Sequence, residues 1–223
     1  MSSRILVVDD DEDVRDVIVS ALERERFDVR QAVDCPTAID VAERFTPHVI
    51  LLDLNLPGMR GIDVCQRIRG FSDAYILMLT ASDELTDKLV ALSTGADDFV
   101  TKPCSMSEIV ARIRALMRRT RSVQSAGRVR TFGDLRVDPD TREVHVAGKP
   151  VSLTRIEFDV LDVLSTDPKV VVPKGRLLER IWGPNWYGDA HVVDVHVSNL
   201  RRKIGSAYIR TVRGVGYRLG EAA

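Results

Sequence analysis

The sequence predicts an α/β domain with a doubly wound parallel sheet, followed by a smaller α+β domain. In the first 120 residues, continuously apolar segments alternate with amphipathic helical segments, which is the βα repeat of such a sheet. The later residues begin with short strand candidates and continue with predicted helices and a hairpin. The first 120 residues carry a formal charge of −6 and the rest +5, so we expect the two parts to have different partners.

The boundary between the two parts is predicted from a change in pattern. Apolar residues recur at helical spacing up to Met117 and are followed by a basic run, then by a stretch of small polar residues. We therefore expect a first domain at residues 1–120, a short flexible linker at 121–127 and a second domain at 128–223.

The first helix after the opening strand is predicted to bury one face. Its apolar residues recur at helical spacing: Val14, Val17, Ile18, Ala21 and Leu22. We expect this face to pack on the sheet.

Four apolar segments of the first domain end in polar residues. The residues that follow or close these segments are Asp9, Asp10 and Asp11, then Asp53, then Thr80, then Lys102. In open α/β sheets the site lies beyond the carboxyl ends of the strands, so we expect these side chains to converge. The sequence therefore predicts a pocket of carboxylates, a hydroxyl and an amine.

This set of groups has a definite chemistry. Crowded carboxylates repel one another unless a cation joins them, and an all-oxygen site suits Mg²⁺. An ionised aspartate beside the metal can attack phosphorus as a nucleophile. The structural alternative is that each acidic residue only caps a helix and that Lys102-Pro103 is only a turn. Asp11 fits that simpler role, as the cap of the helix that follows.

The segments VVDDD, LLDLNLPG, MLTA and FVTKP, in that order, resemble the receiver domain of two-component response regulators. The resemblance implies a five-stranded, flavodoxin-like fold. It also implies that Asp53 accepts a phosphoryl group, with Thr80 as the switch hydroxyl, Lys102 as the phosphoryl contact and Phe99 as the aromatic switch. By the same resemblance, the Mg²⁺ ligands are Asp9, Asp10, Asp53 and the backbone carbonyl of Asn55. Cys104 departs from the pattern, because many relatives have Phe there.

The second domain is predicted to open with strands around 129–137 and 143–146. A helix should start after Thr154 and another should run from about Lys174 to Trp182. A third helix is expected at about 190–204. A hairpin with arginines at its tip is expected at 208–219.

The helix expected at 190–204 has two different faces. Val193, Val197, Leu200 and Ile204 form one buried stripe. The outer face and its flanks mix hydrogen-bonding, apolar and basic side chains: His191, Val195, Ser198, Asn199, Arg201, Arg202 and Lys203. Such a face suits a DNA major groove. The alternative is a solvated basic end that favours the helix dipole. We expect His196 to pack at the helix flank.

The segments LTRIEFDVL, VVDVHVSNLRRKI and IRTVRGVGYRL resemble the winged helix-turn-helix effector of the OmpR/PhoB class. The resemblance implies that residues 190–204 form the recognition helix and that Arg213 lies where the wing reaches the minor groove. It further implies dimerisation of the receiver through charge pairs on one face: Lys88 with Glu108, Asp98 with Arg112, and Asp97 with Arg119. Each of these charges could equally be an ordinary solvated one.

We therefore expect a transcriptional regulator rather than an enzyme, apart from a receiver that catalyses its own phosphorylation and dephosphorylation. The implied partners are a sensor histidine kinase, double-stranded DNA, a second copy of the chain and RNA polymerase, with no membrane. The lack of a spanning segment or signal peptide predicts a cytoplasmic location. Two alternatives stay open: a phosphotransfer sink whose second domain binds only protein, and a constitutive dimer independent of phosphorylation.

Overall fold

The computed structural model describes residues 2–81, 85–118, 129–184, 186 and 190–220, with the backbone alone for 85–88 and 118. The chain divides into two compact units, Met1–Met117 and Arg118–Ala223, which are described separately. The predicted linker, 121–127, lies outside the described residues. Within the described parts of the chain, no helix has the length and apolarity that crossing a bilayer requires.

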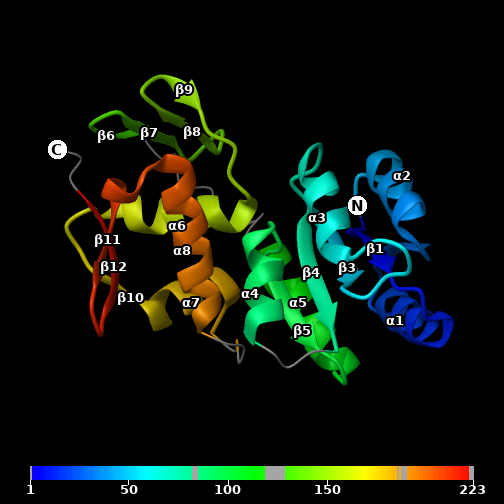
Figure 1. Ribbon diagram of the computed structural model, residues 1–223. Helices are drawn as coiled ribbons and strands as arrows, with labels where there is room; N and C mark the ends of the chain where they lie inside the picture. Colours follow the sequence, from blue (N-terminus) through cyan, green and yellow to red (C-terminus); the bar gives the residue numbers. More distant parts are fainter. Residues whose placement is uncertain (1, 82–84, 119–128, 185, 187–189, 221–223) are drawn as a thin grey trace. The chain divides into compact units, whose positions relative to one another are not determined.

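The first unit is a parallel sheet with its connecting helices (Figure 1). In chain order its elements are β1 (Arg4–Val8), α1 (Glu12–Arg24), β2 (Asp28–Ala32), α2 (Cys35–Phe45), β3 (Val49–Asp53), α3 (Gly61–Arg69), β4 (Tyr75–Thr80), α4 (Leu85–Ser93), β5 (Asp98–Thr101) and α5 (Met106–Arg118). The strand order is β2-β1-β3-β4-β5, and every pairing is parallel. This is the predicted doubly wound sheet.

The core of this unit consists mainly of the three inner strands, in which β3 and β4 are buried at every residue. Helix α1 begins where Asp11 accepts a hydrogen bond from the Val14 amide at 3.1 Å, as the capping interpretation predicted. The buried face of α1 differs from the prediction, because Val17 is 57% exposed and Arg15 is buried. Arg15 is drawn inward because its guanidinium donates to the backbone carbonyl of Asp9.

The described residues of the second unit form two antiparallel sheets and three main helices. Its elements are β6 (Arg130–Phe132), β7 (Leu135–Asp138), β8 (Glu143–Val146), β9 (Lys149–Pro150), α6 (Arg155–Thr166), β10 (Val172–Pro173), α7 (Lys174–Trp182), α8 (His191–Ile204), a 3₁₀ turn (Ser206–Tyr208), β11 (Ile209–Val212) and β12 (Gly216–Leu219). The sheets have the orders β6-β7-β8-β9 and β10-β12-β11. The red hairpin β11–β12 is clear in Figure 1.

Local sequence explains most of these boundaries. Thr154 and Glu157 form a capping box that starts α6. The strand expected over 129–137 is in fact two strands, because Gly133 turns the chain with a positive φ of 57°. The predicted apolar stripe of α8 is confirmed, since its four residues are at most 2% exposed.

Candidate functional site

The first candidate site lies beyond the carboxyl ends of β1 and β3, where three carboxylates meet. Oxygen atoms of Asp9, Asp10 and Asp53 all lie within 4.8 Å of one another. Asp9 and Asp53 are buried, whereas Asp10 is exposed. β1 and β3 are direct neighbours in parallel register, so their ends fall at the same edge of the sheet. The predicted convergence of these strand ends is confirmed.

Lys102 joins this cluster from the end of β5. Its Nζ lies 2.8 Å from Asp9 Oδ2 and 2.9 Å from Asp53 Oδ1. Lys102 N also donates to the Thr80 carbonyl at 2.6 Å, which ties the end of β5 to the end of β4. The lysine thus bridges two buried carboxylates from a strand that neighbours neither β1 nor β3.

Backbone groups hold the two buried carboxylates in place. Asp53 Oδ2 accepts from Asn55 N at 3.1 Å, and Asp9 Oδ1 accepts from Asp11 N at 3.1 Å. Helix α3 starts very close to the pocket, since a Cβ on Gly61 would lie 2.2 Å from the Asp53 carbonyl oxygen. Only glycine fits there without moving the backbone of Asp53.

The pocket shifts the pKa values of its groups in opposing ways. Burial raises the pKa of the Asp53 carboxyl, the charge of Asp9 adds to this, and the contacts with Lys102 offset only part of it. For Lys102, burial by itself lowers the pKa, but bonds to Asp9 and Asp53 outweigh it, so the pKa is raised. Lys102 is therefore a cation, and Asp53 carries a charge that its surroundings incompletely neutralise.

This donor set fits a magnesium ion. All three side chains offer carboxylate oxygens, two of them buried and one at the surface, which leaves positions open to water or to a phosphate oxygen. A single ammonium group shared by two carboxylates leaves excess negative charge, which a divalent cation would balance. Asp9, Asp10 and Asp53 are the side chains placed to hold it.

Thr80 and Phe99 are both buried, at 1% and 8% exposure. Thr80 closes β4, the strand that pairs with β3 so that Asp53 lies opposite Leu79. Phe99 is on β5, opposite Met78. The hydroxyl is therefore one residue beyond the partner of Asp53, at the carboxyl edge of the sheet.

Not all of the charges expected on the dimer surface are exposed. Asp97 is fully buried, and its carboxylate binds Arg69 at 2.5 Å and accepts from Ile76 N at 2.8 Å. The expectation that Asp97 lies on an exposed face opposite Arg119 is wrong. Asp97 immediately precedes β5 and is turned toward the end of α3, where it binds Arg69 instead.

Three of the remaining predicted dimer charges form contacts within one chain. Arg112 lies 2.9 Å from Asp98 and 2.8 Å from Glu108. Asp98 is 1% exposed, so this pair is largely shielded from solvent. The side chain of Lys88 and all of Arg119 lie outside the described residues.

The second candidate site is α8 together with the β11–β12 hairpin. His191, Ser198 and Arg202 are exposed on α8, and Arg213 is exposed at the hairpin tip, as expected. His196 is buried, as predicted, with its ring 5.7 Å from that of Trp182. These positions leave hydrogen-bonding and positively charged groups at the surface of both elements.

Two residues predicted on the outer face of α8 are buried instead. Val195 is 9% exposed and Asn199 is 4% exposed. The single-stripe prediction underestimated the covered width of α8, since a second row, Val192 and His196, is also buried and Asn199 continues it by helical spacing. The Asn199 side chain accepts from Arg202 at 3.2 Å.

Two predicted DNA-binding cations have partners inside the unit. Lys203 binds the buried Glu157 at 2.6 Å. Arg201 donates to the Ile209 carbonyl and to the Thr211 hydroxyl of β11, at 2.8 Å and 2.7 Å. Exposure predicted from helix geometry therefore overstates which cations are free to meet DNA.

Several contributing residues were not singled out from the sequence. Arg15 supports the acidic pocket, Arg69 binds Asp97, and Tyr217 contacts Asp194 of α8. The position of Arg15 in the first turns of α1 does not indicate from the sequence that its side chain points inward. The GVGY segment predicted the hairpin, but it did not indicate that Tyr217 contacts Asp194.

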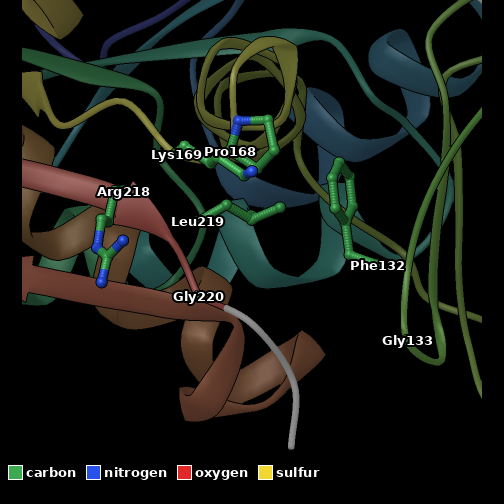
Figure 2. Close-up of a pocket in the computed structure, with 7 residues that line it drawn as sticks. All are labelled: Phe132, Gly133, Pro168, Lys169, Arg218, Leu219 and Gly220. Carbon is green, nitrogen blue, oxygen red and sulfur yellow. The ribbon is translucent and has the colours of Figure 1, made fainter.

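A cavity of about 280 Å³ also lies in the second unit (Figure 2). Its lining residues are Phe132, Gly133, Pro168, Lys169, Arg218, Leu219 and Gly220. It lies at the end of β12, beside the loop that follows α6, and none of the predicted DNA-binding residues lines it.

Comparison with known proteins identifies a domain family in each part of the chain. Residues 5–114 match the response regulator receiver domain, and residues 148–219 match the C-terminal domain of transcriptional regulatory proteins. The chain is 43% identical to the transcriptional regulatory protein CseB of Streptomyces coelicolor, over 97% of each chain. It is 41% identical to the sensory transduction protein RegX3 of Mycolicibacterium smegmatis, over 96% of this chain and 98% of that protein.

Solved structures also match nearly the whole chain. A mutant of the protein RitR matches with a TM-score of 0.83 and 28% identity, over 99% of this chain and all of the other. DrrB, a Thermotoga maritima OmpR/PhoB homologue, matches over the same shares with a TM-score of 0.50 and 28% identity. CseB is named a transcriptional regulatory protein and DrrB a response regulator, so these two relatives are regulators rather than enzymes. The chain belongs to the OmpR/PhoB class of response regulators, with a receiver domain and a DNA-binding domain.

Proposed function

We propose that this response regulator is switched by phosphorylation of Asp53 in a Mg²⁺-dependent reaction, and that the switch controls sequence-specific DNA binding. The observation that carries the proposal is the pocket in which Asp53, Asp9 and Asp10 meet and Lys102 bridges two of them. We place the receiver at 1–120, the linker at 121–127 and the effector at 128–223.

The chain's own residues account for the transfer step. A carboxylate oxygen of Asp53 attacks phosphorus, the bond from phosphorus to the donor atom breaks, and the leaving group keeps the electron pair. Asn55 N orients the carboxylate, and Lys102 moves from Asp53 Oδ1 to a new phosphoryl oxygen. Asp9, Asp10, Asp53 and the Asn55 carbonyl would hold Mg²⁺, which would supply positive charge for the transferred oxygens.

The phosphoryl group is sensed by Thr80 and then by Phe99. The hydroxyl turns to hydrogen-bond the new phosphoryl oxygen, and the buried aromatic side chain fills the space that the threonine leaves. The surface around β5 and α5 changes in consequence and pairs with a second copy. Lys88, Asp98, Glu108, Arg112 and Arg119 remain the proposed contacts, without Asp97.

DNA is read by α8 and by the hairpin. Their exposed polar and basic groups, His191, Ser198, Arg202 and Arg213, are the first proposed contacts. Val195 and Asn199 are buried, so they contact bases only if the side chains that cover them move when DNA binds. Dimerisation places two such units on adjacent half-sites and raises affinity without a new base contact.

The partners follow from this chemistry. The phosphoryl donor is a sensor histidine kinase, and the output is a change in transcription through RNA polymerase. DNA and the catalytic part of the kinase are both accessible in the cytoplasm, so the protein acts in that compartment. The receiver catalyses its own phosphorylation and the later hydrolysis.

The test is incubation of the purified protein with acetyl phosphate and Mg²⁺, read by intact mass. We expect one added phosphoryl group in the unaltered protein and none in Asp53→Asn or in the presence of EDTA. Asp63→Asn, an exposed acid on α3, is the matched control and should behave as the unaltered protein. Equal modification of Asp53→Asn would refute the assignment.

A further inference from the structure

Tyr217 of β12 lies at the centre of a group of charged side chains that joins α7, α8 and the hairpin. Its hydroxyl donates to Asp194 Oδ1 of α8 at 2.5 Å, and Lys174 of α7 lies 2.7 Å from the same carboxylate oxygen. The ring faces two cations, with Lys174 Nζ 5.9 Å and Arg201 Cζ 5.7 Å from its centroid. Burial, followed by the bond to Asp194, raises the pKa of Tyr217, so the hydroxyl remains a donor.

Arg201 completes the group from the last turn of α8. Its Nε and Nη2 donate to the Ile209 carbonyl at 3.1 Å and 2.8 Å, and Nη2 also reaches Thr211 Oγ1. A planar guanidinium held by three hydrogen bonds to one strand has a fixed direction. The side chain therefore links the recognition helix to β11.

The hairpin is also seated closely against β10. A Cβ on Gly216 would lie 2.1 Å from the Val172 carbonyl oxygen, and Lys174 N donates to the Val215 carbonyl at 3.3 Å. Tyr217 pairs with Val172 in the sheet. The end of β12 nearest the hairpin tip is thus fixed on β10. The side chains of Tyr217 and Arg201 link the hairpin to α8.

The geometry points to Arg201 and Tyr217 as positioning residues that hold the hairpin at a set angle to α8, so that both elements reach one DNA site together. This inference rests on the proposed DNA binding and deepens it. It removes Arg201 from the DNA-contacting cations and leaves Arg202, its exposed neighbour, as the phosphate-contacting one.

The two roles differ in their dependence on salt. A cation that contacts a phosphate releases a counterion when DNA binds. Its loss therefore makes the fall of log K with log salt less steep, and we call this reduction in steepness, about 0.9 for each contact, a lower slope. A positioning residue releases no counterion, and its loss lowers the affinity for the specific site while the slope stays unchanged. The loss of a positioning residue also weakens binding less when the hairpin's own DNA contact has already been removed.

The experiment uses the full chain with acetyl phosphate and Mg²⁺ and a duplex selected by that protein from a random-sequence pool, with a scrambled duplex for comparison. Binding is measured over a salt series for Arg201→Gln, Arg202→Gln and Tyr217→Phe, and for Arg201→Gln combined with Arg213→Ala. Thermal unfolding of each variant is recorded, and Tyr217→Phe, which keeps the ring, decides the question if Arg201→Gln unfolds.

We expect Arg201→Gln and Tyr217→Phe to weaken specific binding about tenfold, equivalent to about 1.4 kcal/mol, with the slope unchanged. Arg202→Gln should lower the slope by about 0.9. With Arg213→Ala already present, Arg201→Gln should cost less than about threefold, because contacts that share one element are not additive.

The inference is overturned if Arg201→Gln lowers the slope as Arg202→Gln does, if its cost is the same in both backgrounds, or if folded Tyr217→Phe binds as the unaltered chain. Failure of the proposed function would look different, since the unaltered chain would then select no duplex over the scrambled one. The selection step therefore separates the two.

Discussion

The acidic pocket of the receiver and the α8–hairpin surface of the effector differ in how their side chains are fixed. In the pocket, Asp9, Asp53 and Lys102 meet because they follow strands whose order in the sheet brings their ends together. On α8, helix geometry fixes directions, but the neighbouring elements decide which directions are covered. Strand order therefore predicts which side chains meet in the pocket more reliably than helix periodicity predicts which side chains are exposed.

The largest expected effect concerns a charge that was predicted on a dimer surface and is found in the core. Asp97→Ala leaves the largely buried Arg69 without its carboxylate, so we expect a loss of about 3–5 kcal/mol of stability. The surface pair Arg44–Asp40 in the same unit is the control, and Asp40→Ala should cost about 0.3–0.5 kcal/mol. Urea denaturation compares them, and equal losses would contradict the burial of Asp97.

Next come two glycines, one at each site, where the backbone of another segment leaves no room for a Cβ. Gly61→Ala crowds the Asp53 carbonyl, and Gly216→Ala crowds that of Val172. Each should cost about 1–3 kcal/mol. Folded Gly61→Ala should lose phosphorylation and keep basal DNA binding, whereas Gly216→Ala should do the opposite. Parallel losses in both assays for both variants would remove the distinction between the sites.

A smaller effect is expected at the hairpin tip. Arg213→Ala should weaken DNA binding severalfold and lower the salt slope by about 0.9, since the side chain is exposed and carries one charge. Arg136→Ala, on β7 of the same unit, is the matched loss of charge. If both variants change the slope equally, the effect is one of net charge and the tip has no particular contact.

The smallest effect tests the excess charge in the pocket. Because folding raises the pKa of Asp53, the ionised carboxylate destabilises the Mg²⁺-free protein once the pH exceeds the unfolded pKa. Asp53→Asn should therefore melt slightly higher than the unaltered protein at pH 7 in EDTA, and the difference should shrink as pH falls toward the unfolded value of about 3.9. Adding Mg²⁺ should stabilise the unaltered protein more than the variant. A lower melting temperature for Asp53→Asn in EDTA would contradict this.

Much of the fold followed from the sequence. Four strands of the receiver, the start of α6 after Thr154 and the buried stripe of α8 were predicted from the residue pattern, and the five-stranded sheet was predicted from the resemblance to receiver domains. The turn at Gly133 was missed because the residues on both sides of it favour strands.

The sites were predicted unequally, for a physical reason. Long polar side chains choose partners that are distant in sequence. Arg69 binds Asp97, and Arg201 reaches Thr211. A sequence pattern identifies such residues as charged and gives no partner. This is why Arg201 and Lys203 were expected to be free for DNA, whereas Asn199 was misplaced because more of the α8 surface is covered than one apolar stripe indicates.

The most direct measurement of the central claim is DNA binding by the purified full chain at fixed salt, with and without acetyl phosphate and Mg²⁺, beside Asp53→Ala. The account predicts that the phosphodonor tightens binding to one selected duplex, and that Asp53→Ala shows no such gain. Equal binding in all cases would contradict the switch and favour a constitutive regulator. The absence of any site preference would contradict DNA recognition and favour a phosphotransfer sink.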